Sequence, residues 1–135
     1  MIDCGEKKQV RHFTDLEVWR KSHNLFLEIV NDIKNIPKTE VARIIIEQII
    51  RSIGAIGANI AEGFNARSTK EYIHYLDIAC RSTAESENWF YKFRDCGILK
   101  KEIAGRRIQS TLEIAKMLYG LIKALEKSGR LTKLN

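Results

Sequence analysis

The amino-acid sequence predicts an all-α protein, built as an antiparallel up-down-up-down four-helix bundle. Only one proline and eight glycines interrupt its 135 residues, so long regular segments are possible. Within these segments apolar residues recur at spacings of three and four, and no stretch alternates like a half-buried strand. Helical segments joined by short links favour antiparallel neighbours. We expect one bundle domain over residues 13–127, a flexible N-terminal segment over 1–12 and a flexible basic C-terminal tail over 128–135.

The first predicted helix begins after Thr14 and ends before Pro37. Thr14 and Glu17 have the spacing of a capping box, in which each side chain bonds the other residue's backbone N–H. Apolar and aromatic residues then form a seam at helical spacing: Leu16, Trp19, His23, Phe26, Val30 and Ile33. Because His23 lies on this seam, we expect it to be a hydrogen-bonded core histidine rather than a catalytic base.

The second predicted helix runs from Thr39 or Glu40 to Glu62, with Gly63 as its C-terminal cap. Its apolar residues spread over roughly half of the helix circumference. They are Val41, Ile45, Ile46, Ile49, Ile50, Ile53, Ile56 and Ile60. A helix with one buried face needs a narrower arc, so the sequence predicts self-association to cover the excess.

Small residues lie at the edge of this arc: Gly54, Gly57, Ala58 and Ala61. We expect them to face the narrow middle of the third helix, with a ligand cavity as the alternative; that narrow middle comprises Ala79, Ser82, Thr83 and Ser86. A polar seam nearby predicts a hydrogen-bonded interface: Gln48, Ser52 and Asn59. The predicted oligomer or helix-packing interface comprises Ile49, Ile53, Gly54, Ile56, Gly57, Ala58, Asn59, Ile60, Ala61 and Glu62.

The last two helices have equally clear start and stop signals. Ser68 and Glu71 form a second potential capping box, and the helix that follows should continue to about Asp95, where Cys96 and Gly97 stop it. The fourth helix should begin near Lys100. Its predicted apolar face comprises Ile103, Ile108, Leu112, Ala115, Leu118, Ile122 and Leu125.

The net charge of +6 is concentrated at the C-terminal end of the chain. Residues 1–99 hold 14 Lys and Arg against 14 Asp and Glu, whereas residues 100–135 hold nine against three. Such asymmetry favours an acidic partner, with RNA or DNA first; an ordinary solvated helix face is the alternative. The candidate nucleic-acid-binding residues are Arg67, Lys70, Lys116, Lys123, Lys127 and Arg130.

Motifs for catalysis or metal binding are missing from the sequence. A di-metal helical bundle needs two Glu-x-x-His pairs, and only Glu71 and His74 have that spacing. No phosphate-binding glycine loop or nucleophile triad can be assigned. Three cysteines without metal-like spacing indicate a reduced cytoplasmic protein. We therefore expect no enzyme, metal or cofactor, and neither a signal peptide nor a membrane-spanning segment.

Several segments together carry a resemblance to a known family. They are Phe13–Trp19, Pro37 before Glu40, Gln48–Ile53, Asn59–Gly63, Ser68–Tyr72, Tyr75–Ala79 and Ser82–Glu85. In order and spacing, over about residues 13 to 125, the chain resembles the 23S rRNA intervening sequence protein family. The resemblance implies a bacterial four-helix bundle that assembles into a ring-like homopentamer. A related bundle, the accessory protein of diversity-generating retroelements, is similar in forming a basic pentamer that engages nucleic acid and a reverse transcriptase.

The third helix departs from the family pattern Gly-Ser-Leu-x-Glu-Leu. Here Arg81 replaces the glycine, and Thr83 and Ser86 replace the two leucines, which suggests wetter or looser packing. From residues and resemblance together, we predict a non-enzymatic homo-oligomer that binds RNA or DNA through basic surfaces. The alternative is a protein-binding scaffold or adaptor with no nucleic-acid role.

Overall fold

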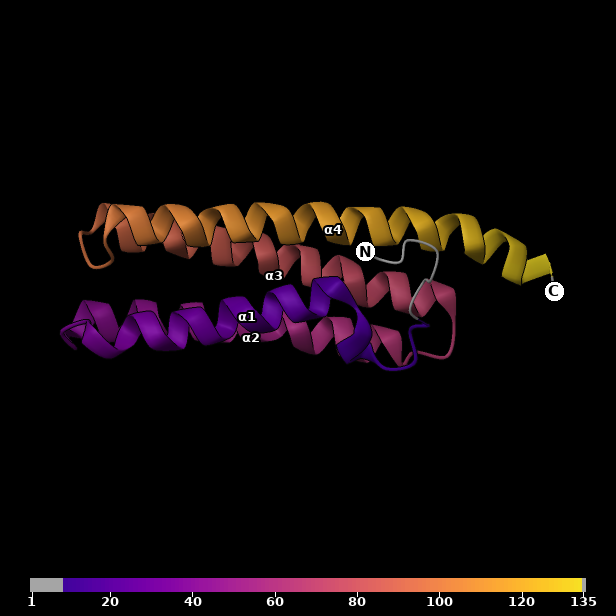
Figure 1. The fold of residues 1–135 in the computed structure, drawn as a ribbon, viewed down its shortest axis with the longest axis horizontal. Helices are drawn as coiled ribbons and strands as arrows, with labels where there is room; N and C mark the ends of the chain where they lie inside the picture. Colours follow the sequence, from indigo (N-terminus) through magenta and orange to yellow (C-terminus); the bar gives the residue numbers. More distant parts are fainter. Residues whose placement is uncertain (1–8, 135) are drawn as a thin grey trace.

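The computed structural model describes the backbone of residues 9–134 and the side chains of residues 9–128. Two short 3-10 helices, η1 (Phe13–Asp15) and η2 (Ile33–Asn35), flank the first α-helix. The four α-helices are α1 (Glu17–Asp32), α2 (Glu40–Phe64), α3 (Thr69–Asp95) and α4 (Lys101–Leu134). They lie side by side with alternating direction, and the last turns of α4 extend past the other helices (Figure 1). The predicted four-helix bundle is confirmed.

The chain enters α1 through a different cap from the predicted one. The carboxylate of Asp15 accepts the backbone N–H groups of Arg11 and His12, each at 3.0 Å, and the His12 ring accepts from the Thr14 N–H. These bonds close η1 as a capping box. The N-cap of α1 itself is Leu16, which makes no side-chain cap bond, so the Thr14–Glu17 box was wrong. The two backbone N–H groups lower the pKa of Asp15.

The buried stripe of α1 lies one position away from the predicted seam. Val18, Ser22, Leu25 and Ile29 are buried, whereas Trp19, Phe26 and Ile33 are only partly covered. His23 is exposed and stacks on the Trp19 ring at a centroid distance of 4.7 Å. The prediction of a core histidine was therefore wrong. Since α1 packs against both α2 and α4, its buried stripe points between them and the aromatic edge is left at the surface.

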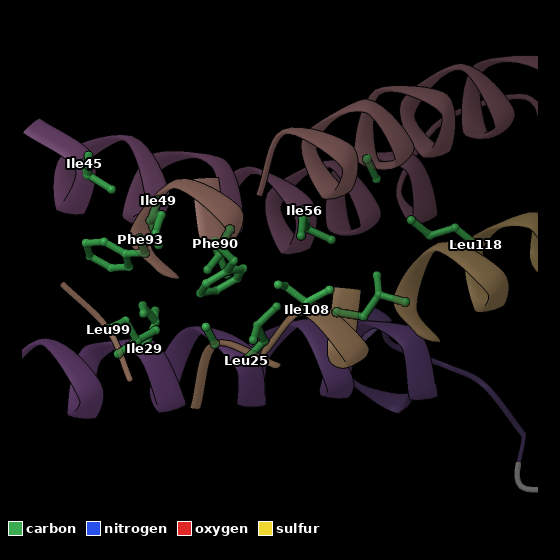
Figure 2. Close-up of a cluster of buried hydrophobic side chains, with 14 of the residues drawn as sticks. Leu25, Ile29, Ile45, Ile49, Ile56, Phe90, Phe93, Leu99, Ile108 and Leu118 are labelled. Carbon is green, nitrogen blue, oxygen red and sulfur yellow. The ribbon is translucent and has the colours of Figure 1, made fainter. Parts of the chain in front are cut away.

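The bundle itself covers most of the isoleucine arc of α2. Five isoleucines of α2 are buried: Ile45, Ile49, Ile53, Ile56 and Ile60. Figure 2 shows three of them with Phe90 and Phe93 of α3, Leu25 and Ile29 of α1, and Ile108 and Leu118 of α4. By length and composition alone α2 could cross a membrane, a test that the core helix of a globular bundle also passes. Only Val41 and Ile44 are large hydrophobics more than half exposed on this helix.

Two expectations about glycines in α2 were wrong. Gly63 lies inside the helix and is buried, while Asn65 is the C-cap. A Cβ on Gly63 would meet Tyr72 Cδ1 at 2.9 Å and Tyr75 Cβ at 3.0 Å, so the missing side chain allows close approach to α3. Gly57 faces Trp19 and Ser22 of α1, not the narrow middle of α3. Among residues 9–134 only Gly97 has a positive φ, at 72°, where α3 ends.

Hydrogen bonds stabilise the narrow middle of α3 inside the core. Thr83 donates to the Ala79 carbonyl at 2.7 Å, and the Ser86 and Ser52 hydroxyl oxygens lie 2.9 Å apart. In the part of the chain with described side chains, every buried polar side-chain atom has a hydrogen-bond partner. Thr83 and Ser86 are thus accommodated in the core without unsatisfied polar groups.

The starts of α2 and α3 agree with the prediction, although Ser68 makes only its own half of the predicted capping box. Thr39 accepts from the Ala42 N–H and Ser68 from the Glu71 N–H, each at 3.1 Å. On α4 one expectation fails, because Leu112 is 46% exposed instead of lying on the core face. The buried stripe of α4 comprises Ala104, Ile108, Thr111, Ile114, Leu118 and Ile122.

Candidate functional site

Three of the predicted basic residues share one exposed stripe of α4 with two large apolar side chains. We define the α4 stripe as Leu112, Lys116, Tyr119, Lys123 and Lys127, all of them exposed. At 100° per residue these positions fall within a sector of about 80°. Tyr119 lies between two lysines, and the side chain is 61% exposed. Sequence reasoning missed Tyr119, although its spacing from Lys116 and Lys123 could have revealed it.

The lysines of the α4 stripe differ from the basic residues on the side of α4 that faces α1. Arg107 binds Asp32 through two hydrogen bonds of 2.7 and 3.0 Å and approaches Glu28 at 3.4 Å. Lys21 of α1 binds Glu113 of α4 at 2.6 Å. The bond to Asp32 raises the pKa of Arg107. Part of the C-terminal basic excess is therefore used to hold α4 against α1.

The α4-stripe lysines have no such use within the bundle. Lys116, Lys123 and Lys127 make no ion pair or side-chain hydrogen bond with any residue of the 9–128 segment. Their positive charge faces solvent along about 16 Å of helix axis, since each residue adds 1.5 Å. A row of unneutralised lysines is the electrostatic pattern of a phosphate-binding surface.

The other predicted basic residues lie at the end of the bundle that holds the C-terminal part of α4. Arg67 is in the link between α2 and α3, and Lys70 is in the first turn of α3; both are exposed. This link lies at the end from which the last turns of α4 extend (Figure 1). The side chain of Arg130 lies outside the described residues. Exposed Glu62, Glu71 and Glu126 lie close in sequence to Arg67, Lys70 and Lys127, whereas the α4 stripe itself contains no acidic residue.

A shallow hollow of about 310 Å³ lies between α1 and α2. We call it the α1–α2 groove, and it is lined by Trp19, Ser22, His23, Phe26, Ile53, Gly54, Gly57 and Ala58. The Trp19 and His23 rings stack with their planes 12° apart, and Phe13 packs edge-on against Trp19 at 5.4 Å. A Cβ built on Gly54 would lie 3.6 Å from Phe26, and one on Gly57 would lie 3.4 Å from Trp19 and Ser22, so each glycine leaves room for about one methyl group in the groove.

The structure divides the predicted interface residues into three groups. Ile49, Ile53, Ile56 and Ile60 belong to the core and pack helices together. Gly54, Gly57 and Ala58 line the α1–α2 groove. The last group belongs neither to the core nor to the α1–α2 groove. Ala61 is partly buried and Glu62 is exposed. Asn59 donates to the Ala55 carbonyl of its own helix at 2.8 Å. The three residues of the predicted polar seam do not act together. Ser52 is hydrogen-bonded within the core, whereas Gln48 and Asn59 are half-buried.

No candidate metal or nucleophile centre emerges from residues 9–128. No three His, Cys, Asp or Glu residues of that segment gather in a way that could hold a metal ion. Glu71 and His74 are both exposed. Cys80 is half-buried, and burial raises the pKa of its thiol, which lowers its reactivity at neutral pH. Cys4 lies outside the described residues.

This bundle is similar in sequence and in fold to known proteins. No curated protein matches the chain. A crystal structure of a protein of unknown function from the S23 ribosomal protein family, from Bacteroides thetaiotaomicron, is similar with a TM-score of 0.71 and 32% identity. The similarity covers 78% of this chain and 98% of that one. The model of the 23S rRNA-intervening sequence protein family matches residues 14–120. The chain belongs to the 23S rRNA-intervening sequence protein family.

Proposed function

We propose that this protein is a non-enzymatic, cytoplasmic homo-oligomer that binds RNA or DNA through the lysines of the α4 stripe. The observation that carries the proposal is the contrast between the two sides of α4. Arg107 is neutralised by Asp32 and Glu28, whereas Lys116, Lys123 and Lys127 have no acidic partner among the described residues. Unpaired lysines release counterions when they bind phosphates, and this release drives nucleic-acid association.

Self-association would multiply this surface. The α1–α2 groove offers half-covered aromatic side chains beside glycines, which suits the close packing of a second copy. The resemblance to ring-forming relatives suggests five subunits. A ring would present several α4 stripes to one nucleic-acid chain, so weak individual contacts would act together.

Salt-dependent RNA binding tests the nucleic-acid proposal. Fluorescence anisotropy with a labelled RNA should show affinity that falls steeply between about 50 and 200 mM salt. The triple variant Lys116→Glu, Lys123→Glu, Lys127→Glu should bind at least tenfold more weakly than the parent, an order-of-magnitude expectation for three lost phosphate contacts. No binding of either RNA or DNA at the lowest salt concentration would reject the proposal.

A control variant separates the local surface from the net charge. Lys34→Glu, Arg43→Glu and Lys100→Glu change the charge equally, but these residues lie where α1, α2 and α4 meet at the opposite end. If binding is local, this control should keep most of its affinity. An equal loss in both triple variants would show that only overall charge matters.

Light scattering tests self-association separately. Ala58→Glu places a charge in the α1–α2 groove at an exposed position, so it should leave the fold intact and shift the protein toward monomer. Ala84→Glu, at an exposed alanine on α3, is the matched control. A parent protein that is monomeric at micromolar concentration would contradict the assembly proposal and leave the RNA result unaffected.

The second candidate function is a protein-binding scaffold or adaptor, and the α1–α2 groove favours it. Half-exposed aromatic side chains such as Trp19 are typical anchors in protein interfaces. A reverse transcriptase or another protein is the kind of partner that the resemblance suggests. Absence of RNA and DNA binding, together with loss of a protein partner in Ala58→Glu, would select this second function.

A further inference from the structure

We propose that the α4 stripe binds unpaired RNA, with Tyr119 stacking on a base while Lys116 and Lys123 hold the flanking phosphates. This inference rests on the proposed nucleic-acid function and adds the class of ligand. It is carried by three observations: the exposure of Tyr119, its position between two unpaired lysines, and the open surface at Gly120.

Tyr119 has no role in the packing of the bundle. At 61% exposed it is the most exposed large hydrophobic side chain of the described residues. It makes no ring contact in the described part of the chain, unlike Tyr72, which meets Phe64 edge-on, or Tyr91, which lies 4.8 Å from the Arg94 guanidinium. An exposed aromatic face that makes no ring contact with the described residues is available to a ligand.

The lysines bracket this ring along the helix. Lys116 comes one turn before Tyr119 and Lys123 one turn after, so about 10 Å of helix axis separates the two ammonium-bearing residues. All three side chains project from the same exposed sector. A polynucleotide that runs along α4 can therefore place a base on the ring and phosphates near both lysines. This combination of stacking and backbone contact is how single strands are held without sequence preference.

Gly120 leaves the helix backbone open between Lys116 and Lys123. It lies next to Tyr119, four residues after Lys116 and three before Lys123. A Cβ built on Gly120 would meet nothing within 4 Å, so internal packing gives no reason for a glycine there. Glycine in a helix interior lowers stability, but it allows a ligand to approach the backbone closely. Along the helix axis it lies between Lys116 and Lys123, at the flank of the α4 stripe, where a strand that runs along the helix can approach the backbone.

The geometry favours unpaired RNA over a duplex. The bases of a duplex are stacked on their neighbours, so a single protruding ring cannot reach a base face without unstacking. RNA presents loops, bulges and ends whose splayed bases stack on aromatic side chains. Lysines alone would hold either form through phosphates. Tyr119 therefore supplies the preference for unpaired RNA over a duplex, and the lysines supply most of the affinity.

Anisotropy with two RNA probes tests this inference on the intact protein. The probes are an unstructured 15-nucleotide RNA and a blunt 15-base-pair RNA duplex. Tyr119→Ala should weaken binding of the single strand at least about fivefold, while duplex affinity changes less than twofold. Tyr119→Phe should keep the parent affinity, because the ring face is retained. Tyr91→Ala, an exposed tyrosine near the other end of the bundle, should change neither.

A second variant tests the same surface by adding a side chain instead of removing the Tyr119 ring. Gly120→Leu should fold at least as well as the parent, since nothing surrounds this position, and should weaken single-strand binding by covering the backbone between Lys116 and Lys123. Binding of a single-stranded DNA of the same sequence tests whether the protein recognises ribose. Equal affinity for DNA and RNA would overturn the assignment to RNA.

The outcomes separate this inference from the proposed function. If the lysine variants lose affinity while Tyr119→Ala binds both probes like the parent, the stacking inference is wrong and the nucleic-acid function stands. If the parent binds neither probe at low salt, the proposed function fails and the inference fails with it. Unchanged melting temperatures by circular dichroism would show that the variants are folded.

Discussion

The hydroxyl oxygens of Ser52 and Ser86 lie 2.9 Å apart at the buried contact between α2 and α3. Both residues are at most 2% exposed, in a core made mostly of isoleucine, leucine and phenylalanine. Ser86 also lies 2.8 Å from the Ser82 carbonyl, and Ser52 lies 3.2 Å from the Ile49 carbonyl. Since each hydroxyl has one proton, the pair shares its donors between the cross-helix bond and the helix backbone.

We expect this pair to couple the stabilities of the two helices. Ser86→Ala should lower the free energy of unfolding by about 1 kcal/mol, because one buried hydrogen bond is lost while Ser52 can still donate to a carbonyl. The double variant Ser52→Ala, Ser86→Ala should cost less than the sum of the single variants by roughly 0.5 kcal/mol or more. Urea unfolding of the four proteins measures this difference, and strict additivity would contradict the coupling.

The Arg107–Asp32 pair should be the most important ion pair between α1 and α4. Their side chains are 11% and 6% exposed, and two hydrogen bonds join them. Arg107→Met would leave Asp32 covered without its partner, which should cost about 2–4 kcal/mol. Arg107→Lys should recover only part of this loss, because an ammonium group cannot make the paired bonds.

A more exposed pair between the same helices provides the control. The Lys21 and Glu113 side chains are 34% and 46% exposed, so Lys21→Met should cost less than about 1 kcal/mol in chemical unfolding. Equal losses from Lys21→Met and Arg107→Met would show that burial does not determine the value of these pairs.

The sequence predicted the helices well because their ends depend on local chemistry. Thr39 and Ser68 each accept a nearby backbone N–H, and the end of α3 at Asp95 is followed by Gly97 in a left-handed conformation. Such signals need no knowledge of the rest of the fold. The Thr14 cap was wrong because Asp15 bonds the two preceding N–H groups instead.

The faces on which the helices pack against one another could not be predicted from local sequence signals. The aromatic seam through Trp19 and His23 has helical spacing, yet Val18 and Leu25 are the buried residues. Both stripes are apolar, and only the positions of two neighbouring helices choose between them. The bond between Arg107 and Asp32 joins residues 75 apart in the chain, and no local pattern specifies that contact. The candidate RNA surface was foreseen in its lysines but not in its tyrosine.

Acid should weaken the bundle through carboxylates that are bonded in the folded state. The hydrogen bond from Lys21, and then that from Gln109, lowers the pKa of Glu113; backbone N–H groups lower the pKa of Asp15. A folded pKa below the unfolded one contributes stability above the unfolded pKa, and this is lost as the pH falls through the folded pKa. The unfolded values are about 4, so the melting temperature should drop below about pH 5.

Glutamine and asparagine variants test this pH dependence. Glu113→Gln and Asp15→Asn should each lower the melting temperature at neutral pH and make it fall less on acidification. Glu126→Gln, on the same helix as Glu113 but without an ion pair among the described residues, should follow the parent curve. Parallel curves for all four proteins would contradict the role of these carboxylates.

Two glycine-to-alanine substitutions should act in opposite directions. At Gly63 a Cβ would lie 2.9 Å from a Tyr72 ring carbon and 3.2 Å from the Tyr72 carbonyl oxygen, and the backbone atom cannot move aside without shifting α3. Gly63→Ala should therefore destabilise the protein by about 1–3 kcal/mol, as overpacking does. At Gly120 a Cβ would meet nothing within 4 Å, so Gly120→Ala should stabilise α4 by about 0.5–1 kcal/mol.

Thermal and urea unfolding of both variants measure these effects against the same parent. The opposite signs are the decisive part, because helix propensity alone predicts that both alanines stabilise. Stabilisation by Gly63→Ala would mean that α2 and α3 are not in close contact at Tyr72. Destabilisation by Gly120→Ala would mean that this glycine has a structural role within the protein or its assembly, and its openness to RNA would then be the wrong interpretation.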